Sequence, residues 1–191
     1  MAIAANEDAI IAARLAELGK AVEVLRSLHA EIARAISLLR ECAQARRLVL
    51  TCGNGGSAAE AMHLAEELVG RYRTSRAPIG AVCLNADPTA LTCIANDFGF
   101  EEVFARQVTA LARPGDLLVA FSTSGRSPNV VRALEEARRA GARTLGLLGG
   151  AGAPAAELCE CALVVRGVDS AAVQEAHQAI MHMLCEALEP R

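Results

Sequence analysis

The stretch LVLTCGNGGSAAEAMHLAEEL, residues 48–68, decides the fold of this chain. Its apolar beginning, Leu48 to Cys52, is typical of a buried β-strand, and a glycine-rich turn over 53–56 follows it. A helical pattern then starts, and the hydroxyl of Ser57 is placed to cap it. Glycines permit positive φ angles and a close approach of a ligand to the backbone. This order of strand, turn and helix predicts a site where open backbone N–H groups bind a phosphate or a sugar.

Two side chains that can carry protons follow the turn. His63 and Glu67 lie four residues apart, so they project from the same face of the expected helix. The single lysine, Lys20, lies in the N-terminal helical region, which argues against a lysine Schiff base or a P-loop lysine. Any chemistry therefore uses carboxylates, imidazoles, hydroxyls or a metal ion.

Strand and helix patterns alternate along the rest of the chain. Continuous apolar strands between helices indicate a parallel sheet that is buried on both faces. We predict an α/β fold, a three-layer α/β/α sandwich with a five-stranded parallel sheet in the assumed order 2-1-3-4-5. After the first strand, the remaining strands are expected at residues 79–84, 117–121, 143–148 and 161–165. The remaining helices are expected from Asp87 to the Asn96–Gly99 break, over 101–112, up to about 140 and over 170–188.

The N-terminal residues form a helical extension in this interpretation. Apolar residues recur at three- and four-residue steps from Asn6 to Arg46, and Gly19 is the expected break between two helices. We divide the chain into this extension, residues 1–46, and an α/β domain, residues 47–191. The extension is longer than one sheet requires, so we expect part of it to pack on another subunit; the alternative is that it covers only its own domain.

Composition excludes several classes of function. The net charge of the 191 residues is −3 without a basic block, which argues against a nucleic-acid partner. No apolar run reaches the roughly 18 residues of a membrane helix, so we expect no membrane partner. The seven cysteines are scattered through strand and helix patterns, as expected of reduced thiols in a cytoplasmic protein.

Two loops are expected at the same edge of the sheet. In a doubly wound sheet, ligands bind beyond the carboxyl ends of the strands where the strand order reverses, here between the first and third strands. Those strands end in CGNGGS and in STSGRS, residues 122–127. The hydroxyls of the second loop suit a phosphate monoester, although an ordinary serine-rich turn has the same composition. The glycine turn lacks the GxGxxG spacing, so a dinucleotide is a weak alternative.

The final helix carries a second group of polar side chains: Gln174, His177, Gln178 and His182. Gln174 and His182 are eight residues apart, or about 12 Å along the axis, yet long side chains can still converge on one ligand. With His63 and Glu67 they offer nitrogen and oxygen ligands that suit zinc. Taken singly, each of these residues is better explained as a packed or solvated side chain, since a lone histidine on a helix is more often that than a ligand.

Four stretches together resemble a known family: GNGGSAAEAMHLAEELVGRY, IANDFGFEEVF, STSGRSPNV and QEAHQAIMH. In this order they resemble the phosphoheptose isomerases of the sugar isomerase (SIS) domain superfamily, from about Leu48 to the C-terminus. The resemblance implies a flavodoxin-like fold, a homotetramer with active sites between subunits, and one zinc ion per site. It also implies a sugar-phosphate substrate, with interconversion of sedoheptulose 7-phosphate and D-glycero-D-manno-heptose 7-phosphate, the first step toward activated heptose.

The resemblance also implies roles for individual residues. Glu67 is the expected general base and His182 its acid/base partner. A departure stands at Ala171, where some members carry an acid. Two alternatives stay open: a non-catalytic SIS protein, such as a replication regulator, and an isomerase of another sugar phosphate. Matching positions place the metal at His63, Glu67, Gln174 and His182, the phosphate at Ser122, Thr123, Ser124 and Ser127, and the sugar at Asn54, Gly55, Gly56, Ser57, Asn96, Asp97, Gln174 and Arg71.

Overall fold

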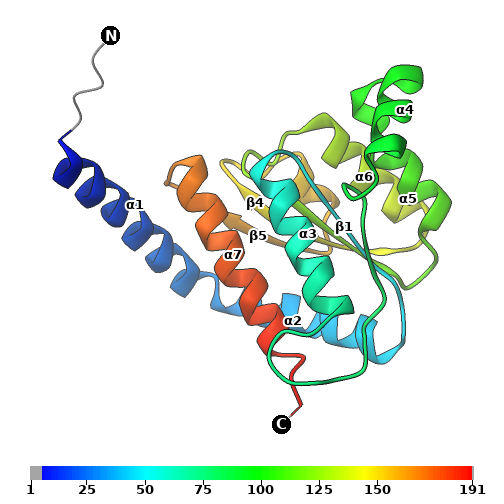
Figure 1. Cartoon of the computed structure of the whole chain (residues 1–191), viewed down its shortest axis with the longest axis horizontal. Coiled ribbons are helices and arrows are strands. Elements are labelled where there is room, and N and C mark those ends of the chain that lie inside the picture. Colours follow the sequence, from blue (N-terminus) through cyan, green and yellow to red (C-terminus); the bar gives the residue numbers. More distant parts are fainter. Residues whose placement is uncertain (1–5, 191) are drawn as a thin grey trace.

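Five parallel strands form the centre of the molecule in the order β2-β1-β3-β4-β5 (Figure 1). The computed structural model describes residues 6–190. The predicted strand order is confirmed, and so is the reversal between the first and third strands. The second strand is shorter than predicted. The strands are β1 (Val49–Gly53), β2 (Ala81–Cys83), β3 (Leu117–Ser122), β4 (Arg143–Gly149) and β5 (Cys161–Val165).

Helices cover both faces of the sheet (Figure 1). Alternate residues of each strand point to opposite faces, so Val49 belongs to one apolar core and its neighbour Leu50 to the other. The first core contains α2 (His29–Gln44), α3 (Gly56–Val69) and α7 (Ser170–Glu186). The second contains α5 (Ala105–Leu111) and α6 (Pro128–Arg139), with α4 (Pro88–Phe98) at its margin. The predicted three-layer sandwich is therefore confirmed.

The helix predicted over 101–112 is interrupted in the structure. A short 3-10 helix, η1 (Phe100–Glu102), precedes α5, and a second, η2 (Ala155–Leu158), lies between β4 and β5. Gly99, which ends α4, has a φ of 93°, a conformation that glycine adopts without a steric penalty. The break predicted at Asn96–Gly99 is therefore present, and it lies at Gly99.

The break between the two N-terminal helices was predicted at the wrong residue. Helix α1 (Glu7–Ser27) runs through Gly19, and the chain bends at Leu28. A single glycine costs a helix only about 1 kcal/mol, which the other residues of a long helix offset. At the bend, the hydroxyl of Ser27 donates to the carbonyl of Val24 at 2.7 Å, a bond that competes with the helical ladder.

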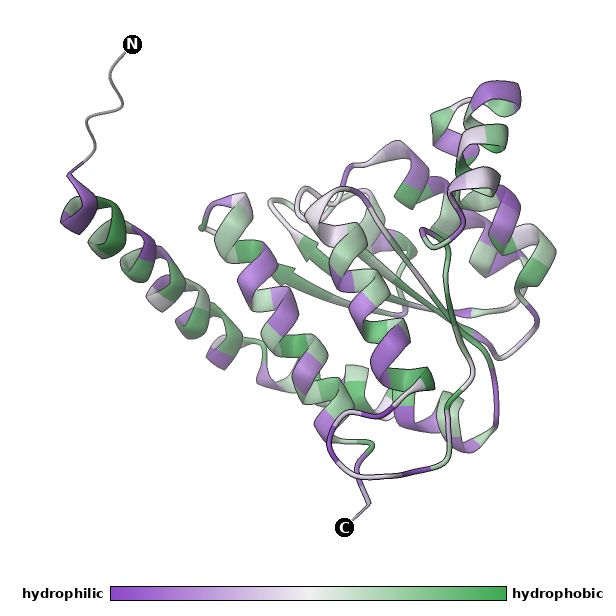
Figure 2. Cartoon of the chain, in the orientation of Figure 1, coloured by the Kyte–Doolittle hydropathy of each residue, from purple (hydrophilic) through white to green (hydrophobic). Residues whose placement is uncertain are grey.

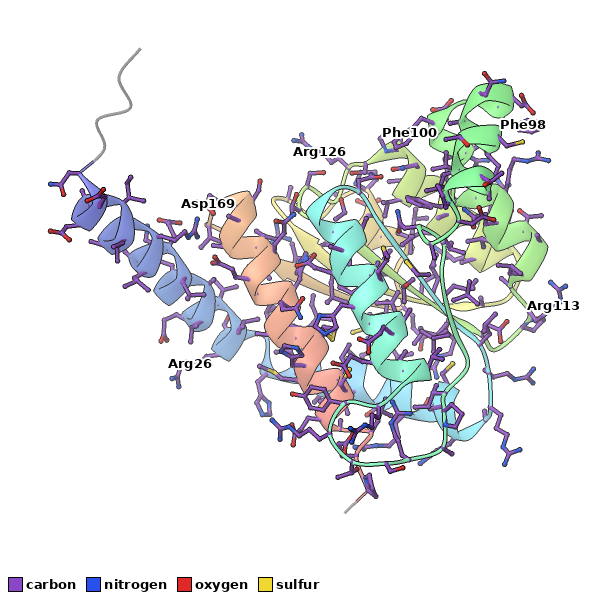
Figure 3. All side chains as sticks on the ribbon, viewed as in Figure 1. Arg26, Phe98, Phe100, Arg113, Arg126 and Asp169 are labelled. Atoms are coloured by element: carbon purple, nitrogen blue, oxygen red, sulfur yellow. The ribbon has the colours of Figure 1, made fainter. Side chains whose placement is uncertain are left out.

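Helix α1 projects from the body of the molecule (Figure 1) and is attached to the beginning of α7. Arg14 contacts Asp169 at 2.9 Å and Glu175 at 3.4 Å. Figure 3 shows Asp169 at the start of α7, on the side facing α1. Apolar residues remain uncovered along α1 (Figure 2), since Ile10 and Ile11 are 56% exposed and Leu15 is 62% exposed.

Most of the cysteines are buried, as expected. Burial raises the pKa of the Cys42 thiol to about 11 and those of Cys159 and Cys185 to about 12. Such thiols carry little thiolate at neutral pH and are poor nucleophiles. None of the helices in the described part of the chain is long and apolar enough to span a membrane.

Candidate active site

The glycine turn and the serine-rich loop meet at one edge of the sheet. The side-chain amides of Asn54, in the turn, and Asn129, at the start of α6, donate to each other at 2.8 Å in both directions. Gly55 is the N-cap of α3 with a φ of 58°, and Ser57 lies inside the first turn. Ser57 therefore does not cap the helix, contrary to the prediction. The meeting of the two loops, which was expected from topology, is present.

The serine-rich loop is ordered by its own hydroxyls. Ser122 Oγ accepts from the backbone N–H of Gly125 at 3.1 Å and lies 3.3 Å from Ser127 Oγ. Ser124 Oγ accepts from the N–H of Arg126 at 3.1 Å. Figure 3 shows Arg126 at the side of the molecule where α3 and α7 begin. Hydroxyls and N–H groups at the start of a helix suit an anion, which makes this loop a candidate phosphate site.

Gly125 supports this loop in a conformation that alanine disfavours. Its φ is +66°, and a Cβ there would lie 2.4 Å from the carbonyl oxygen of Gly152. We expect Gly125→Ala to lower the free energy of unfolding by roughly 2–5 kcal/mol, because the strained φ and the backbone overlap add. Gly167→Ala is the control: φ is +75° but the space around it is open, so about 1–2 kcal/mol is expected. Urea denaturation measures both, and equal losses would contradict the role of the overlap.

A polar cluster of four side chains joins α3 to α7. His63 Nε2 lies 3.2 Å from Glu67 Oε1. The amide nitrogen of Gln178 lies 2.8 Å from His63 Nδ1 and 3.2 Å from His182 Nε2. The rings of His63 and His182 are 5.5 Å apart between centroids, and Tyr72 lies 5.7 Å from His182. The predicted convergence of His63, Glu67 and His182 is therefore observed within one protomer.

The donor set of this cluster suits a divalent metal ion. Glu67 Oε2 is buried and has no hydrogen-bond partner among the described residues. Ligand atoms of His63, Glu66 and Glu67 lie within 4.8 Å of one another. An imidazole nitrogen and a carboxylate oxygen are ligands that zinc accepts. A cation, or a proton of a substrate, would supply the partner that this oxygen lacks.

Other predicted residues lie outside this cluster. Gln174 lies against the glycine turn: a Cβ on Gly56 would be 2.4 Å from its amide nitrogen. Arg71 is exposed and donates to the carbonyl of Arg73. Asn96 and Asp97 are exposed at the end of α4, on the side of the molecule away from α7 (Figure 1). One protomer thus brings only part of the predicted set together.

Sequence reasoning missed two contributions of α7. Gln178, not Gln174, supplies the amide between the two histidines; its position four residues before His182 was the available signal. His177 is fully buried, and its Nε2 lies 3.1 Å from the carbonyl oxygen of Leu148. Its Nδ1 lies 3.8 Å from the buried carboxylate of Glu60. His177 therefore joins α7 to β4, while the Glu60 carboxylate of α3 lies beside it beyond hydrogen-bond distance.

Comparison with known proteins identifies the family. The SIS domain family matches residues 15–149. A phosphoheptose isomerase from Nitratiruptor sp. is 46% identical over 167 residues, which cover 87% of this chain and 89% of that protein. One from Helicobacter pylori is 45% identical over 165 residues, which cover 86% of each protein. The chain belongs to the phosphoheptose isomerases of the SIS domain family.

Solved phosphoheptose isomerases share the fold over nearly the whole chain. The structure from Neisseria gonorrhoeae has a TM-score of 0.88 at 37% identity and covers 95% of this chain and 97% of its own. The structure from Francisella tularensis has a TM-score of 0.87 at 30% identity, covering 96% and 98%. The fold expected from the resemblance is confirmed.

In this phosphoheptose isomerase family member, the loop and the cluster are separated along α3. Glu67 lies eleven residues beyond Gly56, which is about 16 Å along a helix axis. His182 lines a cleft of about 810 Å³ together with Tyr72 and Arg40, between α2 and the end of α7. The serine-rich loop and the polar cluster therefore occupy different parts of the protomer surface.

Proposed function

We propose that the protein is a ketose–aldose isomerase that interconverts sedoheptulose 7-phosphate and D-glycero-D-manno-heptose 7-phosphate. The single observation that carries this is the cluster of Glu67 with His63 and His182, in which one carboxylate oxygen is buried and unpartnered. Membership of the phosphoheptose isomerases supports the same substrate. A non-catalytic binding protein needs no such pair of proton carriers, so the isomerase is favoured over that alternative.

In the proposed mechanism, Glu67 moves a proton between two adjacent carbons of the open-chain sugar. Its Oε2 is the free oxygen, while Oε1 lies 3.2 Å from His63 Nε2. His182 transfers the second proton between the two sugar oxygens. The serine-rich loop and the start of α6 hold the phosphate, with the glycine turn beside the sugar. Isomerisation needs all three actions at once, because an enediolate must be formed, held and reprotonated.

We propose one zinc ion per active site, held by His63, Glu67, His182 and an amide of α7, for which Gln174 is the residue expected from sequence. When bound, such an ion polarises the sugar carbonyl and stabilises negative charge on the enediolate oxygens. The buried, unpartnered oxygen of Glu67 supports a cation at this place. The same carboxylate then serves both the ion and the proton.

Proton exchange with solvent tests the proposed reaction. Sedoheptulose 7-phosphate incubated with the protein in D₂O is expected to gain one deuterium at the carbon that exchanges its proton, followed by NMR or mass spectrometry. Treatment with a chelator is expected to slow this exchange, and added Zn²⁺ to restore it. A hexulose phosphate is the control substrate. A protein that exchanges no proton of the heptulose phosphate contradicts the assignment.

The uncovered apolar residues of α1 support assembly into a homotetramer. Ile11 and Leu15 are more than half exposed in the protomer, and contiguous apolar exposure of this kind is typical of interfaces. We expect the double change Ile11→Glu and Leu15→Glu to shift the mass of the particle from four protomers to a smaller species in light scattering. Glu17→Gln and Glu23→Gln, on the same helix, are the control. An unchanged mass would contradict a role for α1 in assembly.

We assign the protein to the cytoplasm, without nucleic-acid or membrane partners.

A further inference from the structure

The loop between α3 and β2, residues 70–80, passes the ends of both helices that carry the polar cluster (Figure 1). Arg76 attaches this α3–β2 loop to α3. Its guanidinium donates to the backbone carbonyls of Glu67 at 2.7 Å and of Leu68 at 3.0 Å. Carbonyls in the last turn of a helix have no partner inside the helix, so Arg76 caps α3 and fixes the loop beside it.

Two carboxylates at the end of α7 hold the same loop from the other side. Glu189 Oε2 accepts from the backbone N–H of Thr74 at 2.8 Å and from the Thr74 hydroxyl. Glu189 Oε1 lies 3.4 Å from the backbone nitrogen of Arg73, and the Arg73 guanidinium lies 2.8 Å from Glu186. The bonds from Thr74 hold the pKa of Glu189 below its ordinary value, so its carboxylate is charged at neutral pH. The loop is therefore bound to α3 and to α7.

Tyr72 lies in the part of the loop that these carboxylates hold, and its ring packs against His182. The two ring centroids are 5.7 Å apart and the ring planes are inclined by 33°. This distance lies in the range that aromatic pairs favour. The guanidinium of Arg73 lies 5.0 Å from the centroid of the Tyr72 ring, within reach of a cation–π contact. A chain of contacts thus runs from Glu186 through Arg73 and Tyr72 to His182.

The ring of His182 stands at the wall of an open cleft, so its orientation depends on the contacts around it. His182 is half-buried and lines the cleft of about 810 Å³. Within the described residues, its Nε2 has one neighbour at hydrogen-bond distance, the amide nitrogen of Gln178 at 3.2 Å. One such contact does not fix the tilt of a ring, whereas packing against a second ring does. A displacement of about 1 Å near reacting groups can cost about 10²-fold in rate.

We propose that Tyr72 is a positioning residue whose ring holds His182 in place at the cleft. Glu189 acts one step further away: it fixes the α3–β2 loop and thereby the place of the Tyr72 ring. The inference rests on the acid/base role of His182 in the proposed function. It gives the α3–β2 loop a part in turnover that the serine-rich loop and the polar cluster do not supply.

Intrinsic fluorescence tests the link between Glu189 and Tyr72 without any substrate. Tyr72 is the only tyrosine in the sequence and there is no tryptophan, so the emission reports on this one ring. Tyr72 is half-buried in the wild type. Glu189→Ala is expected to free the loop and to raise the acrylamide quenching constant toward that of free tyrosine. An unchanged quenching constant would overturn the link.

Glu160→Ala is the matched control for this change. The carboxylate of Glu160 also accepts surface hydrogen bonds, from the Arg143 guanidinium at 3.0 and 2.8 Å. It precedes β5, at the edge of the sheet opposite β2. We expect Glu160→Ala to leave both the quenching constant and kcat as in the wild type. Equal changes in the two variants would mean that the effect of Glu189 is merely structural.

Steady-state kinetics tests the action of Tyr72 on His182. Tyr72→Leu is expected to lower kcat about 10–100-fold with KM within about twofold, because the ring positions a reacting group and does not bind substrate. Tyr72→Phe keeps the ring and is expected to retain kcat. Glu189→Ala is expected to lower kcat in the same direction, and Glu189→Gln, which keeps an acceptor oxygen for Thr74, to recover most of the loss. Tyr72→Met replaces Tyr72→Leu if the latter melts at a lower temperature.

The contrary outcomes are distinct. A raised KM with unchanged kcat in Tyr72→Leu would make the ring a substrate contact, and a loss of kcat in Tyr72→Phe would assign the effect to the hydroxyl; either overturns the positioning role. A wild-type protein without turnover rejects the proposed reaction and with it the part of Tyr72 in it, while quenching still decides whether Glu189 holds the ring. A wild-type protein that turns over while Tyr72→Leu keeps its kcat rejects the role of Tyr72 alone.

Discussion

Glu67→Gln is expected to lower kcat for heptose phosphate isomerisation by about 10³-fold or more, since a positioned general base contributes about 10²–10⁴-fold. Glutamine has the same shape but cannot accept the carbon-bound proton. The change leaves His63 and His182, the neighbours of residue 67 in the cluster, in place. The loss is therefore expected in deuterium exchange from D₂O as well as in net turnover.

An exposed carboxylate outside the cluster provides the control for this change. Glu23 is exposed on α1, and Glu23→Gln removes an equal charge. We expect Glu23→Gln to retain turnover within about threefold, since an exposed carboxylate contributes little through solvent. A Glu67→Gln protein that turns over at the wild-type rate, with its melting temperature unchanged, would remove Glu67 from the mechanism.

Mixed oligomers of two inactive variants are expected to recover activity. Ser124→Asp places a carboxylate in the serine-rich loop and repels a phosphate dianion, whereas Glu67→Gln disables the cluster. If a site combines the loop of one protomer with the cluster of another, random mixing restores the intact pairing in about one quarter of the sites. Co-expression with two affinity tags isolates the mixed particles, and their turnover per site is the measurement.

The geometry of the protomer is the reason for this expectation. The loop lies at the edge of the sheet, the cluster lies two to three turns along α3, and Asn96 and Asp97 lie on the far side of the molecule (Figure 1). Co-expression of Ser124→Asp with the double variant Ser124→Asp and Glu67→Gln is the control, because no intact loop is present. Mixed particles as inactive as this control would show that each site lies within one protomer.

Much of the fold was predictable because its signals are local. Apolar runs, glycine turns and a proline at the start of a helix act over a few residues, and β5 begins and ends where predicted. The capping of α4 by Asp87 also follows from its own side chain, which accepts from the N–H of Thr89. The bend at Leu28 was missed because Gly19 is a weak local signal, whereas the bend depends on how α2 packs on the sheet.

Part of the candidate site was also predictable from local spacing. The spacing of His63 and Glu67 fixes a shared face, since both residues belong to one helix. The choice between Gln174 and Gln178 differs by one helical turn and was decided by the structure. The buried pair of Glu60 and His177 gave no sequence signal, because each residue alone resembles an ordinary helix side chain.

The sequence by itself determined the strands and helices, the two candidate ligand loops and the faces on which the polar side chains lie, because periodicity and turn chemistry act within each element. Only the tertiary structure decided the strand order, which had been assumed, and which residues of α3 and α7 meet. Their alignment along the helix axes depends on packing between segments more than a hundred residues apart, and a shift of one turn would exchange Gln178 for Gln174 beside the histidines.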